Sequence, residues 1–188
     1  MIMSEKMKQY KSVEESQVSM SLLMTPVNSN FSGKIHGGYI LGLMDQIAFL
    51  CASKHSGNYC VTASVNKVDF LNPVDVGQML HLKASVNYTG NTSMVIGLHV
   101  ETEDIRSGEI KHCNSSYFTM VAKDDDGNSA KVPGLILSSK ETIRRFARSV
   151  QRQHETKVRK ENFKPSEFEV KDYMELLEGH NLDLQFKD

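Results

Sequence analysis

One stretch, residues 30–54, constrains the fold of this chain more than any other: NFSGKIHGGYILGLMDQIAFLCASK. Its glycines and its histidine favour irregular backbone followed by the start of a helix. The residues after Gly38 are mostly apolar and too numerous for one stripe, so we expect a long helix covered on nearly all sides. Asp45 and Gln46 are its only strongly polar groups, and a carboxylate there is costly to bury unless it is paired or used. This helix is the predicted centre of both the core and the chemistry.

The spacing of Gly38 and Asp45 suggests how such a helix works. The two positions are close to two helical turns apart, so they project from nearly the same face. Glycines at a helix start leave backbone N–H groups free at the positive end of the helix dipole, where they stabilise an oxyanion. Along the axis, however, the two positions are about 10 Å apart. We therefore hypothesise a site shared by two antiparallel copies of the helix from two subunits, which a catalytically competent monomer would contradict.

The rest of the first 137 residues predicts an antiparallel sheet. Alternating apolar residues and β-branched runs, separated by turn signals, predict strands over residues 16–24, 61–71, 80–88, 94–100 and 117–122. One helix followed by meandering strands indicates an α+β domain in which the sheet wraps around the helix. We expect a polar N-terminal tail over residues 1–15, this domain over 16–137, and a C-terminal extension over 138–188.

The C-terminal extension is predicted to be a basic helix followed by an acidic segment. A capping box at Ser138 opens the helix. Its narrow apolar stripe consists of Ile143, Phe146, Ala147 and Val150, beside arginines at 144, 145, 148 and 152. After residue 161 acidic side chains dominate, with a short helical segment expected over 173–177. The opposite charges are suited to pairing within or between chains.

Composition narrows the class of protein. A chain of 188 residues with 39% hydrophobic content supports one core, and its net charge of -1 gives no electrostatic case for nucleic acid. The N-terminus lacks the apolar region of a signal peptide, and the longest apolar run is too short to span a bilayer. The three cysteines lack C-x-x-C spacing, which argues against a disulfide framework and against zinc. We predict a cytoplasmic protein with reduced thiols and no membrane partner.

Several catalytic motifs do not occur in the sequence. It contains no G-x-S-x-G elbow, no P-loop and no G-x-G-x-x-G, and its histidines lack metal-ligand spacing, so no metal is expected. His36 is either a catalytic acid or a residue that serves through its backbone or a local hydrogen bond. A carboxylate and helix-terminal N–H groups remain, and these suit the attack of water on an activated carbonyl.

Four segments, taken together, resemble the acyl-CoA hydrolase branch of the hotdog-fold thioesterases. They are GKIHGGYILGLMD at 33–45, VTASVNKVDFLNPVDVG at 61–77, GNTSM at 90–94 and YFTMVAKDDDG at 117–127, followed by KVP at 131–133. The resemblance covers residues 16–135 and implies a hotdog fold, an antiparallel sheet wrapped around a long central helix. It also implies sites at a dimer interface, and many members assemble their dimers further into hexamers. The implied substrate is acyl-CoA, so coenzyme A is part of the substrate and no separate cofactor is expected.

The resemblance also implies roles for individual residues. Asp45 stands where the family has its general base or nucleophile, and N–H groups near Gly37 and Gly38 form the oxyanion hole. Asn30 matches an asparagine of the loop before the helix and joins the predicted catalytic set. The predicted contacts with substrate or coenzyme A are His36, Gly90, Asn91, Thr92 and Ser93. In particular, Thr92 and Ser93 either orient water or pantetheine, or form an ordinary hairpin turn.

Other positions keep two interpretations. For Asp45 the alternative to catalysis is a buried carboxylate that caps a backbone group. Lys34 stands where many relatives have Asn or Asp, and it either meets a phosphate or faces water. The arginines of the C-terminal helix form a solvated face or screen the phosphates of coenzyme A.

We predict a cytoplasmic acyl-CoA thioesterase that releases fatty acid and coenzyme A, with Asp45 activating water. One alternative is a non-enzymatic acyl-CoA sensor or regulatory module on the same fold. Another is a hotdog dehydratase, which needs a histidine and carboxylate pair that this sequence lacks. Chain-length preference depends on the depth of a pocket lined by Phe49, Phe70 and Met94, and side-chain identity does not fix that depth.

Overall fold

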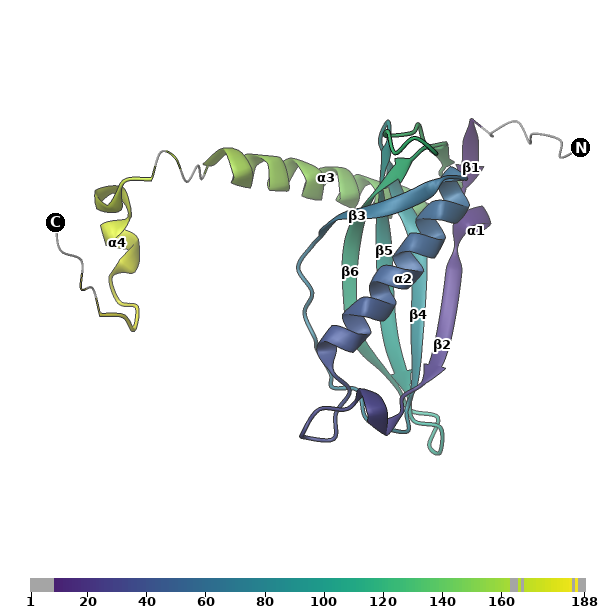
Figure 1. The fold of residues 1–188 in the computed structure, drawn as a ribbon, viewed down its shortest axis with the longest axis horizontal. Coiled ribbons are helices and arrows are strands. Elements are labelled where there is room, and N and C mark those ends of the chain that lie inside the picture. The colour runs from purple at the N-terminus through teal and green to yellow at the C-terminus, as the bar shows by residue number, and fades with distance from the viewer. Residues whose placement is uncertain (1–8, 163–165, 167, 184, 186–188) are drawn as a thin grey trace, which may run out of the picture. The chain divides into compact units, whose positions relative to one another are not determined.

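A computed structural model describes residues 9–162, 166, 168–183 and 185, and Figure 1 shows their fold. An antiparallel sheet with strand order β2-β4-β5-β6-β3 curls around one long helix, α2 (Gly37–Ser56). Its strands are β2 (Val18–Leu23), β3 (Tyr59–Val65), β4 (Met79–Thr89), β5 (Ser93–Glu103) and β6 (Ile110–Lys123). The predicted α+β architecture, a sheet wrapped around a central helix, is confirmed.

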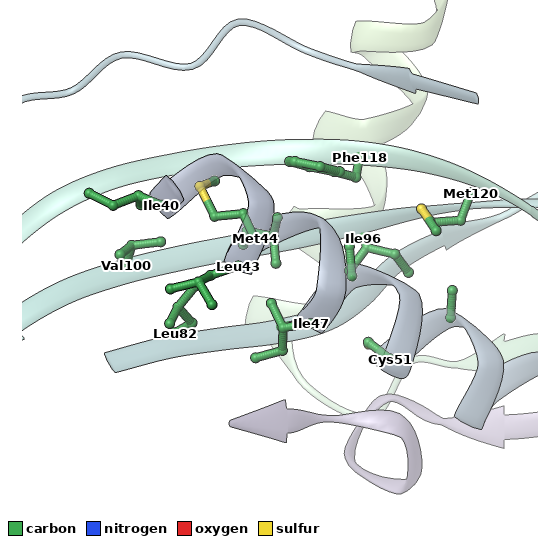
Figure 2. Packing of buried hydrophobic residues seen from close by; sticks show 14 of the residues in the cluster. Ile40, Leu43, Met44, Ile47, Cys51, Leu82, Ile96, Val100, Phe118 and Met120 are labelled. Carbon is green, nitrogen blue, oxygen red and sulfur yellow. The ribbon is translucent and has the colours of Figure 1, made fainter. Parts of the chain in front are cut away.

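The core lies between α2 and the inner face of the sheet (Figure 2). Strand register brings Val86, Ile96 and Phe118 side by side on this face, and all three are fully buried. From the helix, fully or almost fully buried side chains interleave with them, namely Ile40, Leu43, Met44, Ile47, Ala48, Cys51 and Ala52. Burying one such large side chain contributes about 1.5–3 kcal/mol, so this contact supplies most of the driving force for the fold.

Residues 10–16 differ from the polar tail that we expected through residue 15. Strand β1 (Tyr10–Ser12) pairs in parallel with β7 (Gly134–Ile136). A short helix, α1 (Val13–Ser16), follows and begins with a capping box formed by Ser12 and Glu15. A 3-10 turn, η1 (Pro26–Asn28), comes after β2. The pairing of β1 with β7 joins residues more than a hundred positions apart, so no local sequence pattern predicts it.

Two strand predictions are wrong at one end. Strand β3 ends at Val65 rather than residue 71, and its ladder is already interrupted by a register shift between Thr62 and Ser64. Residues 66–71 instead run beside β6, held by two separate backbone hydrogen bonds, Asn66 N to Tyr117 O at 3.0 Å and Leu71 N to Cys113 O at 2.8 Å. Strand β6 begins at residue 110 rather than 117. Its first half was missed because polar side chains on its buried face interrupt the alternation of apolar residues.

One face of α2 is uncovered in the single chain, which corrects our expectation of a helix covered on nearly all sides. Gly38, Gly42, Asp45 and Gln46 are exposed along this face, and the side chain of Leu50 is 48% exposed. In the sequence these residues are interspersed among the buried ones. The helix therefore has a narrow exposed face formed by glycine backbone, polar side chains and an apolar side chain.

The C-terminal end of α2 is fixed by a buried histidine. His55 donates from Nε2 to the carbonyl oxygen of Pro133 at 3.0 Å, so its Nδ1 accepts from the Ser16 hydroxyl at 2.7 Å. The ring thereby joins α1, α2 and the segment before β7. Burial lowers the pKa of His55 below its ordinary value, because the charged imidazolium loses its hydration in the interior.

This histidine predicts a pH dependence of stability. The unfolded chain takes up a proton near pH 6.5, while the folded His55 takes it up only at lower pH. The unfolding free energy should therefore fall as pH drops below 6.5, by at most about 1.4 kcal/mol per pH unit. Urea titrations of His55→Gln at pH 8.0 and 5.5 should show a weaker pH dependence than wild type. His154→Gln, at an exposed position, should keep the wild-type dependence, and equal slopes for all three proteins would contradict the assignment.

The chain divides by its internal contacts into two compact units, residues 1–149 and 150–188, and helix α3 (Lys140–Asn162) crosses the division. Its N-cap is Ser139 rather than the predicted Ser138, with reciprocal bonds between Ser139 and Thr142 at 3.1 and 3.2 Å. Of the predicted apolar stripe, Phe146 packs on the ring of Tyr88 at 5.1 Å, whereas Ile143 is 54% exposed. The predicted boundary between the domain and the C-terminal extension, at residue 137, stays a prediction.

In the second unit, the short helical segment predicted over 173–177 is confirmed. It consists of a 3-10 turn, η3 (Val170–Tyr173), and a helix, α4 (Met174–Leu177). Within the part of the chain that the structure describes, no helix is long and apolar enough to cross a membrane.

Candidate functional site

Asp45 lies on the uncovered face of α2 and is held by one side chain, Thr62 of β3. The Thr62 hydroxyl donates to Asp45 Oδ1 at 2.5 Å. The second carboxylate oxygen, Oδ2, has no hydrogen-bond partner among the described residues. The alternative of a buried carboxylate that caps a backbone group is therefore wrong. An oriented carboxylate with one oxygen open to its surroundings is suited to accept a proton from water.

Thr62 is a site residue that our sequence analysis missed. It lies in the VTASV segment that we had matched only as part of a strand. Alternation along β3 places it beside Met120, its register partner on β6, yet exposed toward α2. A threonine in a strand ordinarily reflects β-propensity alone, so only its contact with Asp45 distinguishes it.

The start of α2 presents two free N–H groups, as the sequence predicted. His36 is the N-cap, and its carbonyl oxygen accepts from Tyr39 N and Ile40 N. Within the described part of the chain, the N–H groups of Gly37 and Gly38 have no acceptor. A Cβ added at Gly37 would meet the Phe70 ring at 3.3 Å, whereas one at Gly38 would meet nothing within 4 Å. Gly38 is also exposed, so this part of the helix start is open to a ligand.

The loop before α2 is organised by Asn30. Its Oδ1 accepts from the backbone N–H groups of Ser32 at 2.9 Å and Lys34 at 3.1 Å. Its Nδ2 has no partner among the described residues and is the part of the side chain left for a ligand. The His36 ring makes no hydrogen bond to the described residues, and the His36 backbone N–H donates to Asn28 O at 2.9 Å. Its part in the chemistry stays a prediction.

Lys34 forms an ion pair that our sequence analysis did not consider. Its Nζ lies 2.5 Å from the Asp75 carboxylate, and the two residues also form an isolated antiparallel bridge. This ion pair ties the loop before α2 to the segment before β4. The Lys34 side chain is also 43% exposed, and its contact with a phosphate stays a prediction.

The predicted residues Gly90, Asn91, Thr92 and Ser93 form the hairpin turn between β4 and β5. Thr92 O accepts from Ala122 N at 3.0 Å, and Asn91 O accepts from Val132 N at 3.1 Å. Ala122 pairs with Cys60, just beyond the C-terminal end of α2. The turn therefore lies at the opposite end of α2 from Gly37 and Gly38 (Figure 1).

One chain thus does not bring the whole predicted set together. His36 and the two glycines lie at the start of α2, and Asn30 lies in the loop before it. Asp45 is about 10 Å further along the axis, and the 90–93 turn lies at the far end. Two antiparallel copies of α2 would juxtapose the start of one helix with the middle and far end of the other. The residues exposed on this helix face are those that such a copy would contact.

The cysteines do not supply a nucleophile. Cys51, Cys60 and Cys113 are all free and buried. Burial raises the pKa of the Cys51 thiol to about 12 and also raises the pKa values of the other two thiols. All three remain protonated at neutral pH. Among the described residues no group of three or more His, Cys, Asp or Glu side chains is arranged to hold a metal ion.

Comparison with known protein families and sequences identifies close relatives. Residues 32–109 match the model of the thioesterase superfamily. Protein VdlD of Helicobacter pylori is 39% identical over 139 residues, which cover 74% of this chain and 79% of that protein. The protein named uncharacterized acyl-CoA thioester hydrolase YkhA, of Bacillus subtilis, is 32% identical over 78% of this chain and 86% of its own length.

Solved structures share the fold and much of the sequence. A hexameric acyl-CoA thioesterase superposes with a TM-score of 0.78 and 35% identity, covering 80% of this chain and 97% of its own. The acyl-CoA hydrolase of Staphylococcus aureus, solved with butyryl coenzyme A and coenzyme A, superposes with a TM-score of 0.76 and 30% sequence identity. The match covers 89% of this chain and 98% of that one. Three further structures of that hydrolase carry alanine for an asparagine, an aspartate or a threonine, which lie 15 and then 17 positions apart. The chain belongs to the acyl-CoA hydrolase branch of the hotdog-fold thioesterase superfamily.

Proposed function

We propose that this protein is an acyl-CoA thioester hydrolase of the cytoplasm that uses Asp45 as its general base. The observation that carries the proposal is the Asp45 carboxylate, exposed on α2 and oriented by the Thr62 hydroxyl at 2.5 Å. The free N–H groups of Gly37 and Gly38 complete the chemistry that thioester hydrolysis requires. The names of the relatives support the same reaction.

The proposed reaction is a direct attack of water. Asp45 takes a proton from water as its oxygen bonds to the thioester carbon. The electron pair of the C=O bond moves onto the carbonyl oxygen, which the two glycine N–H groups hold as an oxyanion. Collapse of this intermediate breaks the C–S bond, and the proton on Asp45 passes to the departing sulfur. The products are a carboxylic acid and free coenzyme A, so the atoms and charges balance.

The residue spacing in the S. aureus hydrolase supports this assignment. Asn30, Asp45 and Thr62 lie 15 and 17 positions apart here, the same spacings as the three residues replaced by alanine in that enzyme. Asn30 Nδ2 is the part of that side chain available to the substrate. We assign Asn30 to substrate positioning beside the oxyanion donors.

We further propose that the site is assembled by two copies of the chain. Strand β3 is an edge of the sheet, paired only with β6 among the described residues, so a second copy can extend the sheet there. Exposed apolar side chains flank this edge, with Tyr59 63% and Leu50 48% exposed. An isologous dimer places both α2 faces together in antiparallel fashion. His36 and the Gly90–Ser93 turn would then border the coenzyme A, and dimers would combine as in the hexameric relative.

Complementation between two inactive variants tests this shared site. In a mixed dimer of Asp45→Asn and Gly38→Pro chains, one of the two sites keeps both Asp45 and the Gly38 N–H. Thiol release from butyryl-CoA should therefore return when the two chains are coexpressed, to about a quarter of wild type for random pairing. Each variant expressed alone is the control and should stay inactive.

The outcomes separate the alternatives. A site contained within one chain gives no recovery, because each chain then carries one defect in its own site. Binding of butyryl-CoA without thiol release by wild-type protein would instead support the acyl-CoA sensor.

A further inference from the structure

One buried side chain in the core lacks a partner among the described residues. Asn114 of β6 is fully buried, and neither its Nδ2 nor its Oδ1 has a hydrogen-bond partner there. A carboxamide offers two donors and an acceptor with two lone pairs. Buried polar groups in native proteins are nearly always bonded, because leaving them unpaired costs their full desolvation. The position therefore calls for a polar group from outside the described residues, either a buried water or an oxygen atom of a ligand.

Strand register places Asn114 on the face of the sheet that meets α2. It lies opposite Val100 of β5, just as Phe118 lies opposite Ile96. Those apolar neighbours are fully buried in the core (Figure 2). Two residues further along β6, Ser116 is also fully buried, but its hydroxyl donates to the backbone carbonyl oxygen of Asn66 at 3.4 Å. Asn114 is therefore distinguished from its polar neighbour by its lack of a partner.

Asn114 also lies at the end of the domain that holds the two free N–H groups. Its register partner Val100 is at the same end of the core as Ile40 (Figure 2). Ile40 belongs to the first turn of α2, about 4.5 Å along the axis from Gly37. The 66–71 segment, which brings Phe70 against Gly37, is bonded to β6 at Cys113, the residue next to Asn114. The unpaired carboxamide and the predicted oxyanion donors thus share one end of the fold.

We propose that Asn114 recognises an oxygen atom carried by the acyl group, and that the preferred substrates are short hydroxyacyl-CoA thioesters. This inference rests on the proposed function, since it takes the thioester carbonyl oxygen to be bound at Gly37 and Gly38. An acyl group anchored there extends past Ile40 toward Asn114. A hydroxyl group accepts from Nδ2 and donates to Oδ1, so it satisfies both atoms. A keto oxygen satisfies only Nδ2, and a methylene satisfies neither.

The core near Asn114 has side chains that can make way for a short chain. Met44, one turn after Ile40 on α2, lies between Ile40 and Phe118 (Figure 2). Methionine has three rotatable bonds and adapts to irregular space more readily than a branched side chain. Under this proposal, Met44 is the side chain that changes rotamer to admit the acyl chain.

The test compares substrates that differ by one hydroxyl group. Full-length wild type, Asn114→Leu and the matched control Ser116→Ala are assayed with butyryl-CoA and with 2-, 3- and 4-hydroxybutyryl-CoA. For wild type we expect at least one hydroxybutyryl-CoA to exceed butyryl-CoA in kcat/KM by at least about tenfold, since a site built for a hydroxyl discriminates against its absence. The ratio should fall to about one in Asn114→Leu and stay unchanged in Ser116→Ala.

Thermal unfolding of the unliganded proteins gives a second measurement. Asn114→Leu should have a higher Tm than wild type, because it removes two unpaired polar atoms at similar volume. Asn114→Ala replaces it in the assays if the leucine variant does not fold. Hydrolysis of butyryl-CoA with no preference for any hydroxyacyl substrate would overturn this inference and leave the proposed function intact. Absence of hydrolysis with every acyl-CoA would overturn both.

Discussion

Asp45→Asn is expected to lower kcat for thioester hydrolysis by about 10²–10⁴-fold, the contribution of a general base. Asparagine has nearly the same shape, and its carbonyl oxygen still accepts from the Thr62 hydroxyl, but it cannot take a proton from water. KM should change little, because the lost interaction is made only in the transition state. Steady-state thiol release measures both constants.

The matched control for this variant is Asp125→Asn. Asp125 is an exposed carboxylate in the turn between β6 and β7, so its replacement makes the same chemical change away from α2. It should leave kcat unchanged. Asp125→Asn should keep the wild-type Tm within about 3 °C, because exposed substitutions away from special features change stability by less than about 0.5 kcal/mol. Asp45→Asn should also stay close to the wild-type Tm, because asparagine still accepts from the Thr62 hydroxyl. Full activity of Asp45→Asn would remove this residue from the chemistry.

Gly38→Pro is expected to lower kcat by about 10²–10³-fold, the usual effect of losing one oxyanion donor. Proline has no backbone N–H and is tolerated in the first turn of a helix, where that N–H has no helical acceptor. A Cβ at Gly38 meets no heavy atom within 4 Å in the single chain, so the Cβ of the proline ring has space there. Far-ultraviolet circular dichroism checks that α2 remains helical.

Gly38→Ala separates the loss of the N–H group from the gain of a side chain. It adds a Cβ at the same place but keeps the donor, so its kcat should fall far less than that of the proline variant. Equal losses in the two variants would show that bulk at this position, and not the N–H, limits the reaction.

Local patterns in the sequence accounted for α2 and for most of the sheet. The run of apolar residues after Gly38 predicted a long helix, and alternation predicted strands because side chains on a strand point to opposite faces in turn. The strand signal failed where a polar side chain occupies a core position. Asn114 and Ser116 are fully buried, so the first half of β6 resembled a loop.

The candidate site was predicted only in part, and for a physical reason. Asp45 and Gly38 share one helix, so helical geometry alone related them, and the structure indeed exposes both on one face of α2. Thr62 was missed because its contact with Asp45 spans two elements whose approach depends on how the sheet curls. The ion pair of Lys34 with Asp75 was missed for the same reason, because it also joins two segments that are distant along the chain.

The sequence by itself determined the central helix, most of the five-stranded sheet and the family, since these depend on residue types at short and regular spacings. Only the tertiary structure decided which face of α2 stays uncovered, which hydroxyl orients Asp45, and which buried carboxamide lacks a partner. Those features arise from contacts between residues distant along the chain. These contacts form only when the whole sheet packs around the helix, so no local sequence pattern predicts them.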